Sequence, residues 1–265
     1  MLRPRLTHFF LKATGLAFVM VAGLIAPAAT AAGVYPSSTL GYDVSYATRV
    51  YPATIFNFAI VSVTRGKALV DNKRFVSEFA WARFGAAAAP TIYMNLNAPY
   101  GSTVAGHIGS PKACAAATNS EPTACEGYNY GYNAAKHSYA YAKANNAVSA
   151  IWWLDIETAN SWSEDPAVND ATLQGAIDYL NAQGIRVGVY SMAFMWREIM
   201  GVGFVPKQAL GGSMVTTPVW MPVGIMSQVA ATNSCLTRTS FIPGNPIWLV
   251  QYEASSTAID QNLAC

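Results

Sequence analysis

The sequence IWWLDIETANSWS, residues 151–163, decides the fold. A nearly continuous apolar run ends at two carboxylates that stand one residue apart, and polar residues follow. The run predicts a buried strand. Alternate side chains of a strand point to the same face, so Trp153, Asp155 and Glu157 share one face and the intervening residues share the other. The two carboxylates therefore predict a polar site at the end of this strand.

The alternation of short apolar runs with helix-like segments continues along the chain. Strands are predicted at 40–45, 56–63, 90–95, 150–157, 185–191, 218–222 and 246–252, and helices at 71–85, 129–145 and 170–184. Repeats of strand, helix and strand imply parallel pairing with right-handed crossovers. The length of the chain favours an α/β fold, a single (β/α)₈ TIM-type barrel, with the eighth strand expected between Met192 and Val205. A doubly wound open sheet is the alternative.

The N-terminal residues have the pattern of a secretion signal. Basic residues without acids precede a short apolar stretch, and small residues follow it, so cleavage is predicted after Ala31. An uncleaved membrane anchor is the alternative, but the apolar run is short for a span. We expect residues 1–31 to be a signal peptide and residues 32–265 to form one secreted domain with no stable membrane association.

The cysteines predict disulfides rather than a metal site. Four cysteines, an even number, suit disulfides in an exported chain, and the expected pairs are Cys114–Cys125 and Cys235–Cys265. A zinc site is the competing interpretation, but no pair has C-x-x-C spacing and the histidines fall in no ligand pattern. No metal and no organic cofactor is predicted. The formal net charge of +2, part of which lies in the leader, gives no case for binding nucleic acid.

Polar residues close several of the predicted strands. They are Asp43, Asn95, Asp155 with Glu157, and Gln251 with Tyr252. In a barrel, catalytic groups lie at the carboxyl ends of the strands. Two neighbouring carboxylates repel each other, and the better desolvated one should keep its proton near neutral pH. Cleavage of a glycosidic bond needs such a pair, one protonated and one negative. Alternatively, Asp155 caps the next helix and Glu157 forms a surface ion pair.

Short motifs in register support the catalytic interpretation. Residues 41–45 read G-x-D-V-S, residues 155–157 read D-I-E, residues 190–191 read Y-S, residues 248–252 read W-x-x-Q-Y and residues 259–262 read I-D-x-N. In this order the chain resembles glycoside hydrolase family 25, the muramidases that cut peptidoglycan. The resemblance covers Gly41 to Asn262 and implies a barrel enzyme that acts on a β-linked amino-sugar polymer.

The resemblance also implies roles for the acidic residues. Glu157 corresponds to the general acid, and Asp155 to the carboxylate that orients the substrate or stabilises charge. Asp43 and Asp260 correspond to further acidic residues of the cleft. Two routes stay open at this point, a direct carboxylate nucleophile and assistance by the acetamido group of the substrate.

Two motifs depart from the family pattern. Members carry K-x-[ST]-E-G after the second strand, where residues 62–66 read SVTRG, and Y-H-F on the third strand, where Tyr93, Met94 and Asn95 stand. The chain thus resembles a divergent branch of secreted glycoside-hydrolase-like domains. The alternative to hydrolysis is a catalytically inactive barrel that only binds a glycan.

Aromatic and amide side chains are the candidates for holding a sugar, because pyranose rings stack on aromatic faces. Trp162, in the loop after the acidic pair, is the first candidate, with packing of that loop as its alternative. The other predicted substrate contacts are Tyr93, Asn95, Tyr190, Gln251 and Tyr252. The expected protein is a secreted monomer whose partner is a cell-wall glycan.

Overall fold

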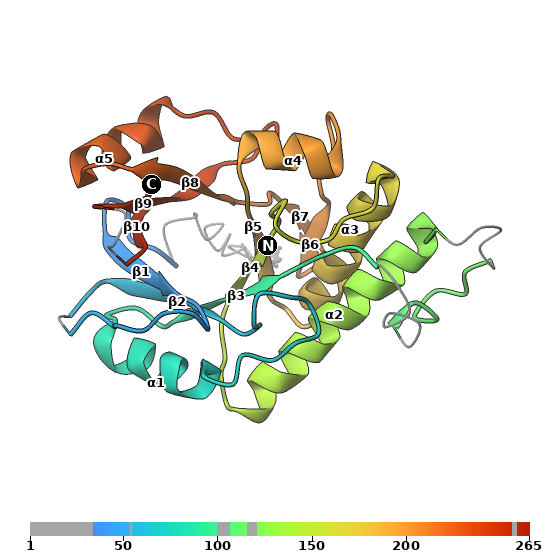
Figure 1. Cartoon of the computed structure of the whole chain (residues 1–265), viewed down its shortest axis with the longest axis horizontal. Helices are drawn as coiled ribbons and strands as arrows, with labels where there is room; N and C mark the ends of the chain where they lie inside the picture. The colour runs from blue at the N-terminus through green and yellow to red at the C-terminus, as the bar shows by residue number, and fades with distance from the viewer. Residues whose placement is uncertain (1–33, 54, 100–106, 116–120, 256–258) are drawn as a thin grey trace, which may run out of the picture. The chain divides into compact units, whose positions relative to one another are not determined.

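The computed structural model describes residues 34–53, 55–99, 107–115, 121–255 and 259–265. The predicted signal peptide lies outside the described residues. Within these residues, eight strands close into a barrel in the order β1-β10-β9-β8-β5-β4-β3-β2 (Figure 1). They are β1 (Leu40–Val44), β2 (Phe58–Ser62), β3 (Thr91–Asn95), β4 (Ile151–Asp155), β5 (Arg186–Tyr190), β8 (Val219–Ile225), β9 (Ile247–Glu253) and β10 (Gln261–Ala264). The predicted α/β barrel and the seven predicted strands are confirmed.

The eighth strand is not where the sequence placed it. Residues 193–200 form helix α4 (Ala193–Met200), which buries Trp196 and Ile199 three residues apart on one side. The eighth strand is β10, which pairs antiparallel with both β1 and β9, whereas the other neighbouring strands of the barrel pair in parallel. The barrel is therefore mixed, and the prediction of a strand between Met192 and Val205 is wrong.

Helices cover the outside of the strands. They are α1 (Phe75–Gly85), α2 (Ala124–Ala144), α3 (Pro166–Ala182), α4 and α5 (Gln228–Thr237), and a small separate sheet joins β6 (Gln208–Leu210) to β7 (Ser213–Val215). The three predicted helices are present. Two of them begin earlier than predicted because Thr123 forms a capping box with Glu126 at the start of α2, and Asp165 caps α3.

The two faces of β4 belong to different parts of the core. Trp152, Leu154 and Ile156 join the large apolar cluster that the strands share with the helices. Trp153 belongs to a separate cluster with Phe58, Trp220 and Trp248. The alternation predicted from the sequence is confirmed, and it directs Asp155 to the same side as Trp153.

An N-terminal tyrosine closes the base of the barrel. Tyr35 is 4% exposed and its ring centroid lies 4.8 Å from that of Phe58. Its hydroxyl donates to Thr91 Oγ1 at 2.7 Å and accepts from Trp153 Nε1 at 2.9 Å. The amino ends of β2, β3 and β4 are thus sealed, which leaves the carboxyl ends of the strands as the open side of the interior.

Both predicted disulfides are present. Cys114 pairs with Cys125 at a Cα–Cα distance of 5.6 Å, and Cys235 pairs with Cys265 at 5.2 Å. In the part of the chain that the structure describes, no helix is long and apolar enough to span a membrane. Among the same residues, no cluster of three His, Cys, Asp or Glu side chains could hold a metal ion.

Candidate active site at the carboxyl ends of the strands

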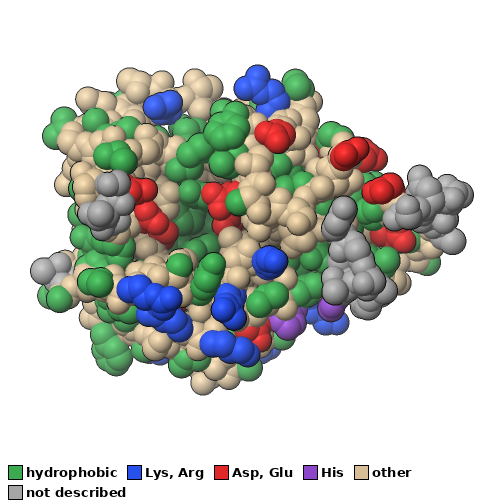
Figure 2. Space-filling model, viewed as in Figure 1, with side chains coloured by type: hydrophobic (Ala, Val, Ile, Leu, Met, Phe, Trp, Pro, Cys, Tyr) green, Lys and Arg blue, Asp and Glu red, His purple; other side chains and the backbone are tan. Residues whose placement is uncertain are grey.

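A cavity of about 290 Å³ opens at the carboxyl ends of the barrel strands. It is lined by Asp43, Ser45, Tyr93, Asp155, Glu157, Tyr190, Trp220, Gln251, Glu253 and Asp260. The four carboxylates predicted from the sequence all lie here, although they come from segments far apart in the chain. Figure 2 shows acidic side chains gathered around a hollow near the middle of the face it presents.

Asp43, at the end of β1, is held by two amides. Gln251 Nε2 donates to Asp43 Oδ1 at 3.0 Å, and Asn262 Nδ2 donates to the same oxygen at 2.7 Å. The hydroxyl of Tyr190 donates to Gln251 Oε1 at 2.7 Å, which turns the amide nitrogen of Gln251 toward Asp43. Burial and the negative charge of Asp260 raise the pKa of Asp43 to about 8, although both amide bonds lower it.

Asp155 is the most deeply placed acid of the D-x-E pair. Its side chain lies at the end of β4, the residue is 5% exposed, and Asn95 Nδ2 donates to its Oδ2. Burial, the charge of Glu157, a hydrogen bond shared with Glu157 and the charge of Asp43 all raise the pKa of Asp155 well above its usual value. Because Asp155 is better buried than Glu157, burial favours a proton of this pair on Asp155.

Glu157 and Asp260 lie nearer to the opening. Burial raises the pKa of Glu157, while the hydrogen bond with Asp155 lowers it. The pKa of Asp260 is raised to about 6, by burial and by the charges of Glu253 and Glu157. Among the described residues named as lining this cavity there is no Lys or Arg, and the acids repel one another. Such an arrangement keeps protons on carboxyl groups near neutral pH, as acid catalysis requires.

Comparison with known proteins points to one group of relatives. The sequence model of a family described as "Lysozyme-like protein 1" matches residues 121–210, which include Asp155 and Glu157. "Probable GH family 25 lysozyme 4" of Dictyostelium discoideum is 41% identical over 61 residues, which are 23% of this chain and 28% of that protein. Over these stretches the chain is similar to family 25 lysozymes. "Lysozyme-like protein 5" of Caenorhabditis elegans is 33% identical over 78 residues, 29% of this chain and 36% of that protein.

The barrel fold has a counterpart among solved structures. The spore cortex lytic enzyme SleM of Clostridium perfringens superposes with a TM-score of 0.52 at 12% identity, covering 87% of this chain and 68% of that chain. At this identity the likeness concerns the fold alone. The matched stretches span well under half of the two curated relatives, so their activities are no direct description of this chain.

Three of the predicted substrate contacts lie outside the cavity lining. Tyr252 follows Gln251 on β9 and therefore points to the opposite face, where it is buried with Val250 and Leu263. Trp162 Nε1 donates to the backbone oxygen of Glu157 at 2.8 Å, and its ring packs on the outer core. Tyr252 supports the sheet from outside, which corrects its assignment, whereas Trp162 packs the loop after β4 and lines hollows beside this cavity.

The third, Asn95, is 8% exposed and is bound to Asp155, so it supports the acid rather than the sugar. The remaining predicted contacts, Tyr93, Tyr190 and Gln251, do line the cavity.

The structure adds site residues that the sequence did not identify. Glu253 lines the cavity, two residues after Gln251 on the same face of β9. Asn262 binds Asp43 and also accepts from Trp220 Nε1 at 2.7 Å. The period of two along β9 could have found Glu253. Asn262 could have been noticed as part of the motif I-D-x-N, but its contact with Asp43 forms only because β10 is a strand of the barrel.

Proposed function

We propose that this protein is a secreted glycoside hydrolase that cleaves a β-linked amino-sugar polymer, with peptidoglycan as the substrate. One observation carries the proposal: five carboxylates, from β1, from β4 and the residues that follow it, from β9 and from the segment before β10, line one open cavity. The match to the lysozyme-like family model over residues 121–210, which include Asp155 and Glu157, supports the choice of substrate. The two disulfides are consistent with the proposed export to an oxidising compartment.

Glu157 is the general acid of the proposed reaction. It lies nearer to the opening than Asp155 and shares a hydrogen bond with it. When a substrate acetamido N–H takes the place of that bond at Asp155, the shared proton passes to Glu157. Glu157 then donates it to the glycosidic oxygen as the bond from that oxygen to the anomeric carbon breaks.

The acetamido group of the substrate serves as the nucleophile in this proposal. Its carbonyl oxygen bonds to the anomeric carbon while Asp155, now a carboxylate, holds its N–H. Water then opens the cyclic intermediate at the anomeric carbon and gives a proton to Glu157, which restores the acid. Asp43 and Asp260 contribute negative potential where positive charge develops on the sugar. Each step uses groups that line the cavity.

Purified protein incubated with bacterial cell walls tests the proposal. We expect the turbidity of the wall suspension to fall and new reducing ends to appear. Co-sedimentation with the walls without new reducing ends would instead identify a glycan-binding barrel. That second function gains some support from the third strand, where Asn95 stands in place of the histidine of the family pattern.

A further inference from the structure

A line of buried polar groups leads from the end of β2 to the carboxyl pair. Thr64, Asn95 and Asp155 are 1%, 8% and 5% exposed. Thr64 Oγ1 donates to Asn95 Oδ1 at 2.8 Å and accepts from the backbone N–H of Asn95 at 2.9 Å. Asn95 Nδ2 in turn donates to Asp155 Oδ2. The three strand ends are therefore linked by side-chain hydrogen bonds beneath the cavity.

These bonds determine which way the amide of Asn95 faces. The hydroxyl of Thr64 has one hydrogen, which it donates to Asn95 Oδ1, while its oxygen accepts from the backbone N–H of Asn95. The NH₂ group of Asn95 must then face Asp155 Oδ2, which acts as an acceptor. Asp155 Oδ1 is buried and receives no hydrogen bond from a donor in the described residues. It is the oxygen left to carry a proton.

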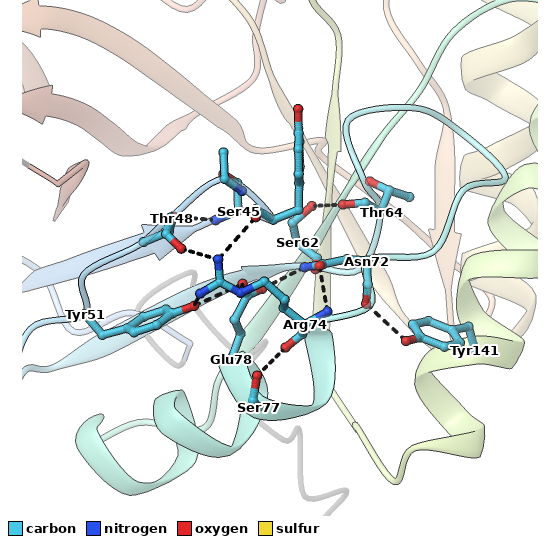
Figure 3. A network of polar contacts seen from close by, with 12 residues as sticks. Ser45, Thr48, Tyr51, Ser62, Thr64, Asn72, Arg74, Ser77, Glu78 and Tyr141 are labelled. Carbon is cyan, nitrogen blue, oxygen red and sulfur yellow. Dashed lines mark hydrogen bonds and ion pairs between the residues drawn. The ribbon is translucent and has the colours of Figure 1, made fainter.

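The loop that follows β2 holds Thr64 rigidly. The hydroxyl of Ser62 donates to the backbone oxygen of Thr64 at 2.8 Å, and the amide nitrogen of Asn72 donates to the backbone oxygen of Ser62 at 2.8 Å (Figure 3). Asn72 Nδ2 also donates to Glu78 Oε2 at 2.7 Å, and Glu78 is 1% exposed in α1. Thr64 is thus fixed by a buried network that reaches into a neighbouring helix.

We propose that Thr64 and Asn95 are positioning residues that place the proton of the carboxyl pair on Asp155 Oδ1, from where it passes to Glu157. The transfer is balanced: the O–H bond at Asp155 breaks, the O–H bond at Glu157 forms, and the negative charge moves to Asp155. The catalytic use of this proton rests on the proposed function, but its location does not. The titratable groups that face Asp155 are Glu157, Asp43, Tyr93 and Tyr190.

The variants Thr64→Val and Thr64→Ser test this positioning. Valine keeps the shape of threonine but removes the hydroxyl, so the amide of Asn95 can turn over and present its oxygen to Asp155 Oδ2. The proton can then bind Oδ2 in place of Oδ1. We expect kcat to fall by at least about tenfold with KM unchanged and the pH profile to shift. Serine retains the hydroxyl, and we expect it to preserve the wild-type profile.

Infrared difference spectra recorded during a pH titration give a readout that needs no substrate. The C=O stretching band of protonated Asp155 is identified by its loss in Asp155→Asn. We expect Thr64→Val to change its frequency and titration midpoint, and Thr64→Ser to leave both unchanged. Asn95→Ala, which removes the amide, should change the band in the same direction and replaces Thr64→Val if that variant does not fold.

The outcomes separate the two proposals. An Asp155 band that is identical in wild type, Thr64→Val and Asn95→Ala overturns the positioning role, whatever the activity. A drop in thermal stability without a change in the band or in the pH profile also overturns it, because a merely structural role gives that result. A shifted band in a protein that cleaves no glycan supports the positioning role and rejects only the proposed function.

Discussion

Trp153 and Asp155 point to the same side of β4, yet their surroundings are opposite. Trp153 is fully buried among Phe58, Trp220 and other apolar side chains, and its indole nitrogen has a partner in Tyr35. Asp155 is almost as deeply buried but shares its cavity with further acids, and burial raises its pKa. The lower interior of the barrel, at the amino ends of the strands, contributes to stability. The upper interior, at their carboxyl ends, holds the cluster of acids that line the cavity, and burial of these acids opposes folding. Such a division is expected where a site is maintained for its chemistry.

In the upper interior, the substitution Glu157→Gln has the largest expected effect on activity. It removes the proton donor while keeping the shape of the side chain, so we expect hydrolysis of cell walls to fall by about 10²–10⁴-fold. Because the change also removes one negative charge from the acid cluster, the free energy of unfolding should stay the same or rise. Glu164→Gln, at an exposed acid seven residues along the chain, is the matched control and should keep full activity. Equal activity of the two variants would contradict the assignment.

Trp153→Ala tests the lower interior, where we expect a loss of stability rather than a direct loss of activity. Removing this fully buried ring leaves a cavity beneath the site, and we expect a loss of about 3–5 kcal/mol in the free energy of unfolding, measured with urea. Phe84→Ala removes an aromatic ring that is 91% exposed and should change the stability by less than about 0.5 kcal/mol. A similar small loss in both variants would mean that the lower interior is not the main source of stability.

The acid cluster should also give stability a distinctive pH dependence. Burial raises the pKa of Asp43 from 3.8 to about 8, so the folded state binds more protons than the unfolded state between these values. The free energy of unfolding should therefore fall as the pH rises from about 4 to about 8. In Asp43→Asn, which cannot ionise and whose amide oxygen can accept the same two hydrogen bonds, this slope should be smaller. Urea unfolding at several pH values measures both slopes, and identical slopes would exclude Asp43 as a source.

The acidic residues at the strand ends were predictable from the sequence because they stand where the apolar runs of the strands end. Asp43, Asp155 and Glu157 each follow an apolar run, so periodicity and motif give the same answer. β10 was not predictable in this way. Its four residues include Gln261 and the buried Asn262, and polar residues inside a short strand break the apolar alternation that identifies strands.

Long-range contacts explain the remaining differences between sequence and structure. Tyr252 and Trp162 carry the right chemistry for a sugar site, but the sheet turns one away from the cavity and the loop after β4 packs the other. The Thr64–Asn95 bond joins residues 31 apart, and neither residue type signals such a partner. A sequence thus shows which residues could do the chemistry more readily than which residues support them.

The smallest effect is expected for Tyr35→Phe, which sharpens the contrast because it removes a single oxygen at the base. The ring remains packed on Phe58, but Trp153 Nε1 loses its acceptor and Thr91 loses a donor. Thr91 keeps its bond to the backbone oxygen of Ala59, so the unpaired group is the buried indole N–H, which should cost about 1–3 kcal/mol in the free energy of unfolding. Tyr46→Phe, at a tyrosine that is 40% exposed, is the control and should change it by less than about 0.5 kcal/mol.

The activity of folded Tyr35→Phe, measured well below its melting temperature, decides whether the two ends are independent. No group at the base takes part in the proposed proton transfer, so we expect the kcat and pH profile of wild type. A loss of activity in the folded variant would show that the base also positions the acids, through Trp153 and the face of β4 that it shares with Asp155. The division between a stabilising base and a catalytic mouth would then have to be given up.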